Sequence, residues 1–389
     1  MKNLLLILSI VLIYQKSLGQ NIENEPYAFF SEEYIQKYNN KSVIEIPEVS
    51  ELVNIIMTLH KDAENEDNMF DVSTEYYKRV KEYFKESINH PIIDSIENNI
   101  GNITLLEEHD IKVFSRESYN FYYNLKMNAC SYYFDENGNI IHNGAVKNFR
   151  GGDNLVDKYL NLIQSFSKQS NFRQFYRDNK TYYDSLTSTY IRLNPIQQMQ
   201  NWLNKKFDYS YGSYVIYFSP LVNGAHSARF FNKGEFKQAF MFVCPIETNP
   251  EISLIEDEIM SSRPLFTEID HSYVNPLSDK YIEKINHSFS NKKIWAYGEI
   301  TESYHNEYMI FNEYMTFALY SLYVFDNYPE ENLNKYLSYL EKQMVESRGF
   351  IKFKDFNREL LKKYKLNPEI KMSELYDYIL KWASKVNKT

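Results

Sequence analysis

The spacing of apolar residues limits this chain to a mostly helical fold with only a few strands. Val49, Leu52 and Ile56 lie three or four residues apart, which places their side chains on one face of a helix. Beyond residue 250 the apolar residues keep this helical spacing to the end of the chain. The pattern predicts an α+β protein that is predominantly helical.

Three segments have strand patterns instead. Residues 213–219 and 240–244 are compact runs of β-branched and aromatic residues, and a proline follows each run. Residues 136–139 form a turn sequence between two strand-like arms, 130–134 and 140–146. We therefore expect one hairpin and a small sheet among the helices.

The first residues have the composition of a cleavable signal peptide. Lys2 precedes an apolar run over residues 4–13, and the small residues Ser17 and Gly19 occupy the positions that a signal peptidase requires. The run is too short to cross a bilayer, and no later segment has the length of a membrane span. We expect residues 1–19 to be removed and the protein to be secreted or periplasmic.

We place one domain boundary in the mature chain, near residue 206. Residues 20–205 are expected to form an N-terminal, mostly helical region that contains the hairpin. Residues 206–389 are expected to form a second region with the strands at 213–219 and 240–244 followed by helices.

The charge of the chain argues against some classes of partner. It has 43 Lys and Arg against 52 Asp and Glu, a formal net charge of −9 at pH 7. Because phosphate backbones bind positive fields, we expect no nucleic-acid partner. Glycine is rare, at 11 of 389 residues, and no glycine-rich phosphate-binding motif occurs, which argues against a nucleotide-binding fold.

The chain contains two cysteines, Cys130 and Cys244. Their spacing excludes a CxxC metal or redox motif. In an exported protein such a pair forms either one disulfide or two buried free thiols, and the sequence does not choose between these states.

One window has the pattern of a zinc-peptidase helix. Such a helix carries two histidines four residues apart, which bind the metal, and a glutamate after the first histidine, which polarises a bound water. Glu268 and His271 occupy the glutamate and second-histidine positions, and Thr267 stands where the first histidine belongs. We expect these three residues to share one helix that starts after Pro264 and ends near Asn275-Pro276, because proline suits a first helical turn and disfavours helix in the residue before it. Glu313, in a later helical segment, would supply a third, carboxylate ligand.

The chain resembles the domain-of-unknown-function 4932 family. These are exported bacterial proteins whose first helix reads His-Glu-x-x-His-Ser-Phe-Val-Asn-Pro and whose later helix carries Asn-Glu. The resemblance implies a zincin-like metallopeptidase fold for the second region and a hydrolase activity. The segments that carry it are Glu51 to Ile56, Tyr77 to Phe84 with His90-Pro91, Tyr217 to Gly224, Glu268 to Pro276 and Asn312-Glu313.

The sequence departs from this family at positions that bear on the metal. The resemblance implies Glu268 as the catalytic residue and His271 and Glu313 as zinc ligands. Thr267 removes the first ligand, and Phe317 stands where the family has an arginine. Because a catalytic zinc needs three protein ligands, we expect zinc to bind weakly or not at all.

Two features leave the ligand set open. His226, His287 or His305 could supply the missing ligand, and we place His305 first because it precedes the helix of Glu313. Glu307 competes with Glu313 for the third position, because the tetrapeptide Asn-Glu-Tyr-Met occurs at both places. Six residues turn a helix by about 240° net, so the two glutamates cannot face the same site.

Two functions of different classes follow. In the first, the protein is a degenerate metallopeptidase-like protein, inactive or impaired, that binds a peptide or another protein. In the second, it is an active zinc-dependent peptidase whose missing ligand comes from a residue such as His305. The alternative role for His271 is structural, as a hydrogen-bonded histidine in a packed helix. Metal-free chemistry is disfavoured because Asp270 points away from Glu268.

Overall fold

The computed structural model describes most of the chain and divides it into two compact units. The sheet unit contains Ile22–Tyr190 and Gly212–Pro245, and the helical unit contains Ile191–Tyr211 and Ile246–Thr389. The expected signal peptide, residues 1–19, lies outside the described residues. The structure describes residues 28–61, 63–65, 70–100, 103–106, 111–114, 116–150, 152–223, 227–246, 248–298, 301 and 304–388.

A four-stranded mixed sheet forms the centre of the sheet unit. Its order is β1-β6-β8-β7, with β1 parallel to β6, β6 parallel to β8, and β7 antiparallel to β8. The inner strand β6 is buried along its whole length, as its run of β-branched and aromatic residues requires. The strands are β1 (Lys41–Glu45), β6 (Ser213–Phe218), β7 (Ser227–Lys233) and β8 (Phe236–Val243).

The sheet confirms two expected strands and adds two. The predicted strand at 213–219 is β6, and the one at 240–244 is the second half of β8. β1 pairs with β6 in register Val43↔Val215, so the sheet joins residues from both sides of the boundary that we placed near residue 206.

The expected hairpin is present but shorter than its sequence pattern. Strands β4 (Tyr132–Phe134) and β5 (Ile140–His142) pair antiparallel, with Tyr133 opposite Ile141. A second pair consists of β2 (Ile103–Leu106) and β3 (Ile111–Phe114).

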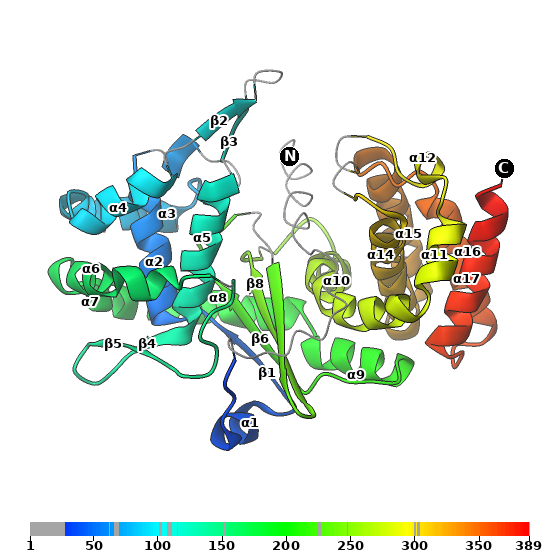
Figure 1. The fold of residues 1–389 in the computed structure, drawn as a ribbon, viewed down its shortest axis with the longest axis horizontal. Helices are drawn as coiled ribbons and strands as arrows, with labels where there is room; N and C mark the ends of the chain where they lie inside the picture. The colour runs from blue at the N-terminus through cyan, green and yellow to red at the C-terminus, as the bar shows by residue number, and fades with distance from the viewer. Residues whose placement is uncertain are drawn as a thin grey trace. The chain divides into compact units, whose positions relative to one another are not determined.

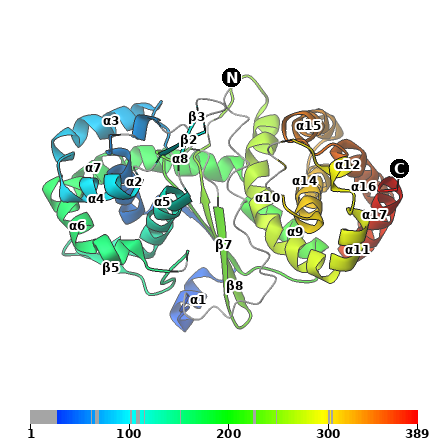
Figure 2. The ribbon, with the colours of Figure 1, turned by 45° about the horizontal axis from the view of Figure 1, so that its top comes forward.

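The helices of the sheet unit surround α2. This helix is buried at every position from Val49 to Thr58, and it packs against α4, α5, α6 and α7 (Figures 1 and 2). A helix that is apolar on most sides is stable only in such a core position. The helices are α1 (Glu32–Tyr38), α2 (Glu48–Thr58), α3 (Glu75–Tyr83), α4 (Pro91–Ile100), α5 (Arg116–Asn128), α6 (Leu155–Gln169), α7 (Phe172–Asp178) and α8 (Lys180–Leu193), with short 3₁₀ turns at Ala63–Asn65, Lys85–Ser87 and Ala129–Ser131.

The helical unit is built around α14. All its residues from Ile310 to Val324 are buried, and it packs against α10, α11, α15 and α16 (Figures 1 and 2). The helices are α9 (Ile196–Lys206), α10 (Leu254–Lys280), α11 (Ile282–Ser288), α12 (Lys292–Trp295), α14 (Glu307–Asn327), α15 (Glu330–Lys342), a π-helical turn (Gln343–Ser347), α16 (Phe353–Leu366) and α17 (Met372–Val386).

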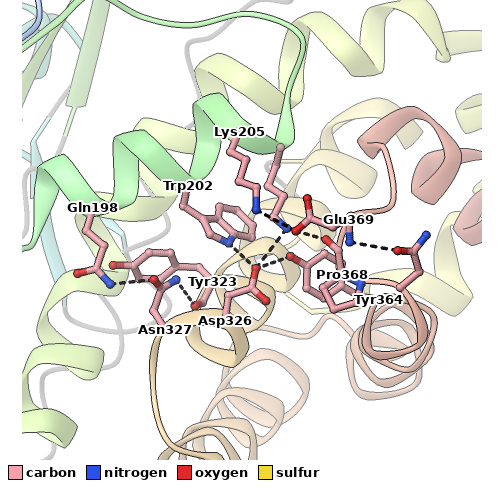
Figure 3. A network of polar contacts seen from close by, with 11 residues as sticks. Gln198, Trp202, Lys205, Tyr323, Asp326, Asn327, Tyr364, Pro368 and Glu369 are labelled. Atoms are coloured by element: carbon pink, nitrogen blue, oxygen red, sulfur yellow. Dashed lines mark hydrogen bonds and ion pairs between the residues drawn. The ribbon is translucent and has the colours of Figure 1, made fainter.

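Asp326, in the last turn of α14, ties α9 to the rest of the helical unit (Figure 3). Its carboxylate accepts hydrogen bonds from Trp202 Nε1 at 2.8 Å and from the Tyr364 hydroxyl at 2.5 Å. The buried ammonium of Lys206 lies 3.3 Å from the same oxygen and donates to the Pro368 carbonyl at 2.7 Å. The Asp326 carboxylate and the buried Lys206 ammonium are stable here because they pair with each other and form hydrogen bonds with their other neighbours.

The structure confirms a predominantly helical α+β protein with a small sheet. Within the described part of the chain, no helix combines the length and apolar character needed to cross a bilayer.

Candidate functional site

The zinc-peptidase-like window lies within one long helix, α10, as expected, but the predicted ends of that helix were wrong. The sequence suggested a start after Pro264 and an end near Asn275, whereas α10 continues through both Pro264 and Pro276. The helix begins at a capping box formed by Ser253 and Glu256, in which each side chain accepts a hydrogen bond from the other residue's backbone N–H. This capping signal is readable in the sequence and was missed.

Tertiary packing explains why two prolines stay inside α10. A proline in a helix interior removes one backbone hydrogen bond and costs about 3 kcal/mol. Residues Ile269, Tyr273 and Val274 are fully buried between these prolines, and α10 packs along α14. Burying each such side chain contributes roughly 1.5–3 kcal/mol, which offsets the loss at the prolines.

The expected site residues divide between the buried and the exposed sides of α10. Thr267 is buried, and its hydroxyl donates to the Pro264 carbonyl at 3.0 Å. Asp270, one helical turn later, is completely buried on the same side. Glu268 and His271 are only partly buried. The threonine hydroxyl is therefore bonded to its own helix.

Glu313 lies on α14 and pairs with an arginine rather than with a histidine. Its carboxylate accepts from Arg348 Nη2 at 2.5 Å, and both side chains are almost fully buried. The same Nη2 donates to the Tyr304 hydroxyl at 2.9 Å. The Arg348 guanidinium lies over the Phe317 ring at 4.6 Å from its centroid.

Asp270 adds a second acid beside this pair. Burial raises the pKa of the Asp270 carboxyl well above its usual range, and the nearby charges of Glu313 and Glu268 raise that pKa further. Among the residues that the structure describes, neither of its carboxylate oxygens has a hydrogen-bond partner. A neutral, protonated Asp270 is the form that this interior favours.

The asparagines of the motif join the two helices. Asn312, directly before Glu313, donates from Nδ2 to Asn275 Oδ1 at 3.0 Å. The Tyr308 hydroxyl, one turn earlier on α14, donates to Asp279 Oδ1 at 2.7 Å. The two asparagines that flank the expected ligands therefore form a polar contact between α10 and α14.

The alternative ligands do not complete a metal site in the described part of the chain. His305 is exposed just before α14, His287 is exposed on α11, and Glu307 is partly buried in the first turn of α14. His226 lies outside the described residues. Among the residues that the structure describes, no three or more His, Cys, Asp or Glu side chains gather in a group able to hold a metal ion.

The donor set therefore does not fit a catalytic zinc ion. A threonine hydroxyl engaged with Pro264 stands at the first ligand position, and the Glu313 carboxylate is neutralised by Arg348. Zinc in peptidases takes three protein ligands and leaves a fourth position for water. The roles of His271 and Glu313 as ligands, and of Glu268 as a catalytic group, stay predictions from the resemblance.

Sequence reasoning missed a buried acid in the sheet unit. Glu51, in the first turn of α2, is completely buried, and burial raises the pKa of its carboxyl to about 7. The Tyr76 hydroxyl donates to its Oε1 at 2.6 Å and shares a 2.6 Å hydrogen bond with the Tyr183 hydroxyl. Ser219, which follows β6, lies beside this carboxylate because the ends of parallel strands meet at one sheet edge.

Both cysteines are free thiols, which excludes the disulfide, but only Cys130 is buried as expected and Cys244 is partly exposed. Cys130 is buried, and its thiol donates to Ser50 Oγ at 3.4 Å. Burial raises the pKa of the Cys130 thiol to about 12, so this group has little nucleophilic thiolate at neutral pH.

Comparisons of the chain with family models, with curated proteins and with solved structures found no match.

Proposed function

We propose that this chain is an exported, metallopeptidase-like protein that has lost peptidase activity and binds a peptide or another protein. The observation that supports this function best is the buried ion pair of Glu313 and Arg348. The family resemblance assigns the Glu313 carboxylate to zinc, but in the structure this carboxylate is paired with the guanidinium of Arg348. Thr267, at the first ligand position, has no imidazole to offer.

The helix surface remains suited to a binding role. Glu268 and His271 lie three residues apart on α10, which places them side by side on the helix surface. Both residues keep part of their surface exposed, which supports a binding role for this pair. Such a pair can hydrogen-bond the backbone amides of an extended peptide without a metal.

Metal content and hydrolysis test the loss of activity. The mature chain, residues 20–389, is purified with excess ZnCl₂, dialysed, and examined by plasma mass spectrometry and by cleavage of a fluorogenic peptide library. We expect far less than one zinc per chain and no cleavage above that of the matched variant His271→Ala. Zinc near one per chain that disappears in His271→Ala or His305→Ala would favour the active peptidase instead.

Binding is tested on the same surface. We expect fluorescence anisotropy with a labelled peptide library to detect binding that Glu268→Gln and His271→Ala weaken by about tenfold, or about 1.4 kcal/mol. The matched control is His287→Ala, an exposed histidine on α11 of the same unit. Equal binding by all these variants would exclude this face of α10 as the binding surface.

A further inference from the structure

The interior of the helical unit contains an unusual arrangement of charges around Phe317. Two guanidinium groups lie over this ring, that of Arg348 at 4.6 Å and that of Arg263 at 5.5 Å from the centroid. Both arginines are about 6% exposed. They differ in their partners, because Arg348 pairs with the Glu313 carboxylate whereas Arg263 donates to the neutral side chain of Gln343.

Arg348 is held in place by a segment with little freedom. The next residue, Gly349, has a φ of +78°, and a Cβ at this position would lie 2.0 Å from the Tyr297 carbonyl oxygen, so only glycine fits. Tyr297 N–H donates to the Gly349 carbonyl at 2.9 Å, and Ile351 N–H donates to the Trp295 carbonyl at 3.0 Å. These contacts hold the backbone that follows Arg348 against residues 295–297.

The ionised carboxylate of Glu313 requires a cation next to it. Glu313 is 2% exposed, and the neighbouring Asp270 is not exposed at all. An ionised carboxylate in such a place is stable only when it is paired or bound to a metal. The guanidinium of Arg348 is the group in contact with the Glu313 carboxylate.

We infer that Arg348 takes the place of a metal ion as the cation that neutralises Glu313 in the interior of the helical unit. This inference rests on the proposed function, because it explains how the protein keeps the acidic third-ligand position without zinc. Arg348 then has two effects. It stabilises the packing of α14, and it prevents the Glu313 carboxylate from binding a metal even when the first imidazole is restored.

A double-mutant cycle tests the charge role without any metal. Arg348→Met should lower the thermal unfolding midpoint much more than the matched control Arg263→Met, because only the first change leaves a buried carboxylate unpaired. Glu313→Gln should recover a large part of the loss in the Arg348→Met background. The inference is overturned if the two arginine variants lose equally or if Glu313→Gln recovers nothing.

The cycle stays informative if Arg348→Met alone does not fold. In that case Glu313→Gln/Arg348→Met is compared with Glu313→Gln, and we expect the neutral pair to fold with a smaller loss of midpoint. A Glu313→Gln/Arg348→Met variant that is as unfolded as Arg348→Met would contradict a role of Arg348 in charge neutralisation.

A zinc arm separates this inference from the proposed function. We expect ZnCl₂ to raise the unfolding midpoint of Thr267→His/Arg348→Met and to leave that of Thr267→His unchanged, since a ligand of the folded state stabilises it. An equal response of the two variants, present in both or absent in both, overturns the inference. The proposed function fails separately, if the unmodified protein carries zinc and cleaves peptides.

Discussion

At the scale of single residues, buried polar groups set the main electrostatic properties of this protein. Glu51, Asp270 and Glu313 are acids in the cores of the two units, and Asp270 differs from the other two because its oxygens have no hydrogen-bond partner among the described residues. Glu313 has an arginine, and Glu51 accepts from the Tyr76 hydroxyl. The partner decides whether a buried acid stays charged, because hydrogen bonds and opposite charges favour the carboxylate whereas desolvation favours the neutral acid.

Glu51 should make the stability of the sheet unit depend on pH. Its pKa rises from 4.5 to about 7 on folding, so the folded state binds the proton more tightly. This stabilisation is complete below pH 4.5 and is lost as the pH rises through 7. Glu51→Gln, which stays neutral, should therefore gain up to about 3 kcal/mol relative to the unmodified protein between pH 4.5 and pH 8.

Urea unfolding at a series of pH values measures this difference. The matched control is Glu235→Gln, which changes an exposed glutamate in the turn between β7 and β8 of the same unit. Its free energy of unfolding should follow that of the unmodified protein at every pH. A constant offset between Glu51→Gln and the unmodified protein would show that Glu51 does not change its protonation on folding.

At the scale of secondary structure, both local sequence signals and tertiary packing determine where α10 begins and ends. Ser253 and Glu256 define its start by satisfying orphan backbone donors, a signal that lies within four residues of sequence. Pro264 and Pro276 are equally local signals, and they predict ends that the structure does not have. Burial of the helix against α14 outweighs them, because several large apolar side chains contribute more than one lost backbone bond costs.

The capping box should contribute measurably to stability. Ser253→Ala removes the acceptor for the Glu256 N–H, and loss of such a cap costs about 1 kcal/mol. Ser261→Ala, the same change about two turns into α10, should cost less, because it removes one long hydrogen bond to Asp257 while alanine has the higher helix propensity. Denaturant unfolding of both variants checks this, and equal losses would mean that packing alone fixes the start of α10.

At the scale of the whole molecule, each unit is assembled from segments far apart in the chain. Lys41 in β1 pairs with Ser213 in β6, and Asp326 joins α9 to the end of α14 (Figure 3). These long-range contacts bury charged groups together with their partners. The helical unit therefore depends on Asp326 and Lys206 as one set.

Asp326→Asn should strongly destabilise the helical unit. The change keeps the shape of the side chain but leaves the buried Lys206 ammonium without a countercharge, and breaking such a pair costs about 3–5 kcal/mol. The exposed neighbouring pair of Lys205 and Glu369 is the matched control, since Lys205→Met should cost less than about 1 kcal/mol. Unfolding followed by tryptophan fluorescence measures both, and similar small losses would show that Lys206 tolerates the loss of its partner.

Local patterns in the sequence predicted much of the fold but little of the proposed site's environment. Helical spacing located the C-terminal helices, and compact β-branched runs located β6 and part of β8. β1 was not predicted, because Lys41 to Glu45 is short and gains its stability from pairing with a buried strand. Arg348 was not predicted as the partner of Glu313, since no local pattern connects residues on separate elements.

The sequence by itself determined that Thr267, Glu268 and His271 share one helix and that a threonine stands where the zinc-peptidase pattern has its first histidine, because helix periodicity and residue identity are local properties. Only the tertiary structure decided that Thr267 donates to its own helix and that Glu313 pairs with Arg348. Backbone preferences act over one or two turns, whereas the neighbours of a buried charge depend on which distant segments pack together. The partner of a carboxylate is for this reason a property of the fold.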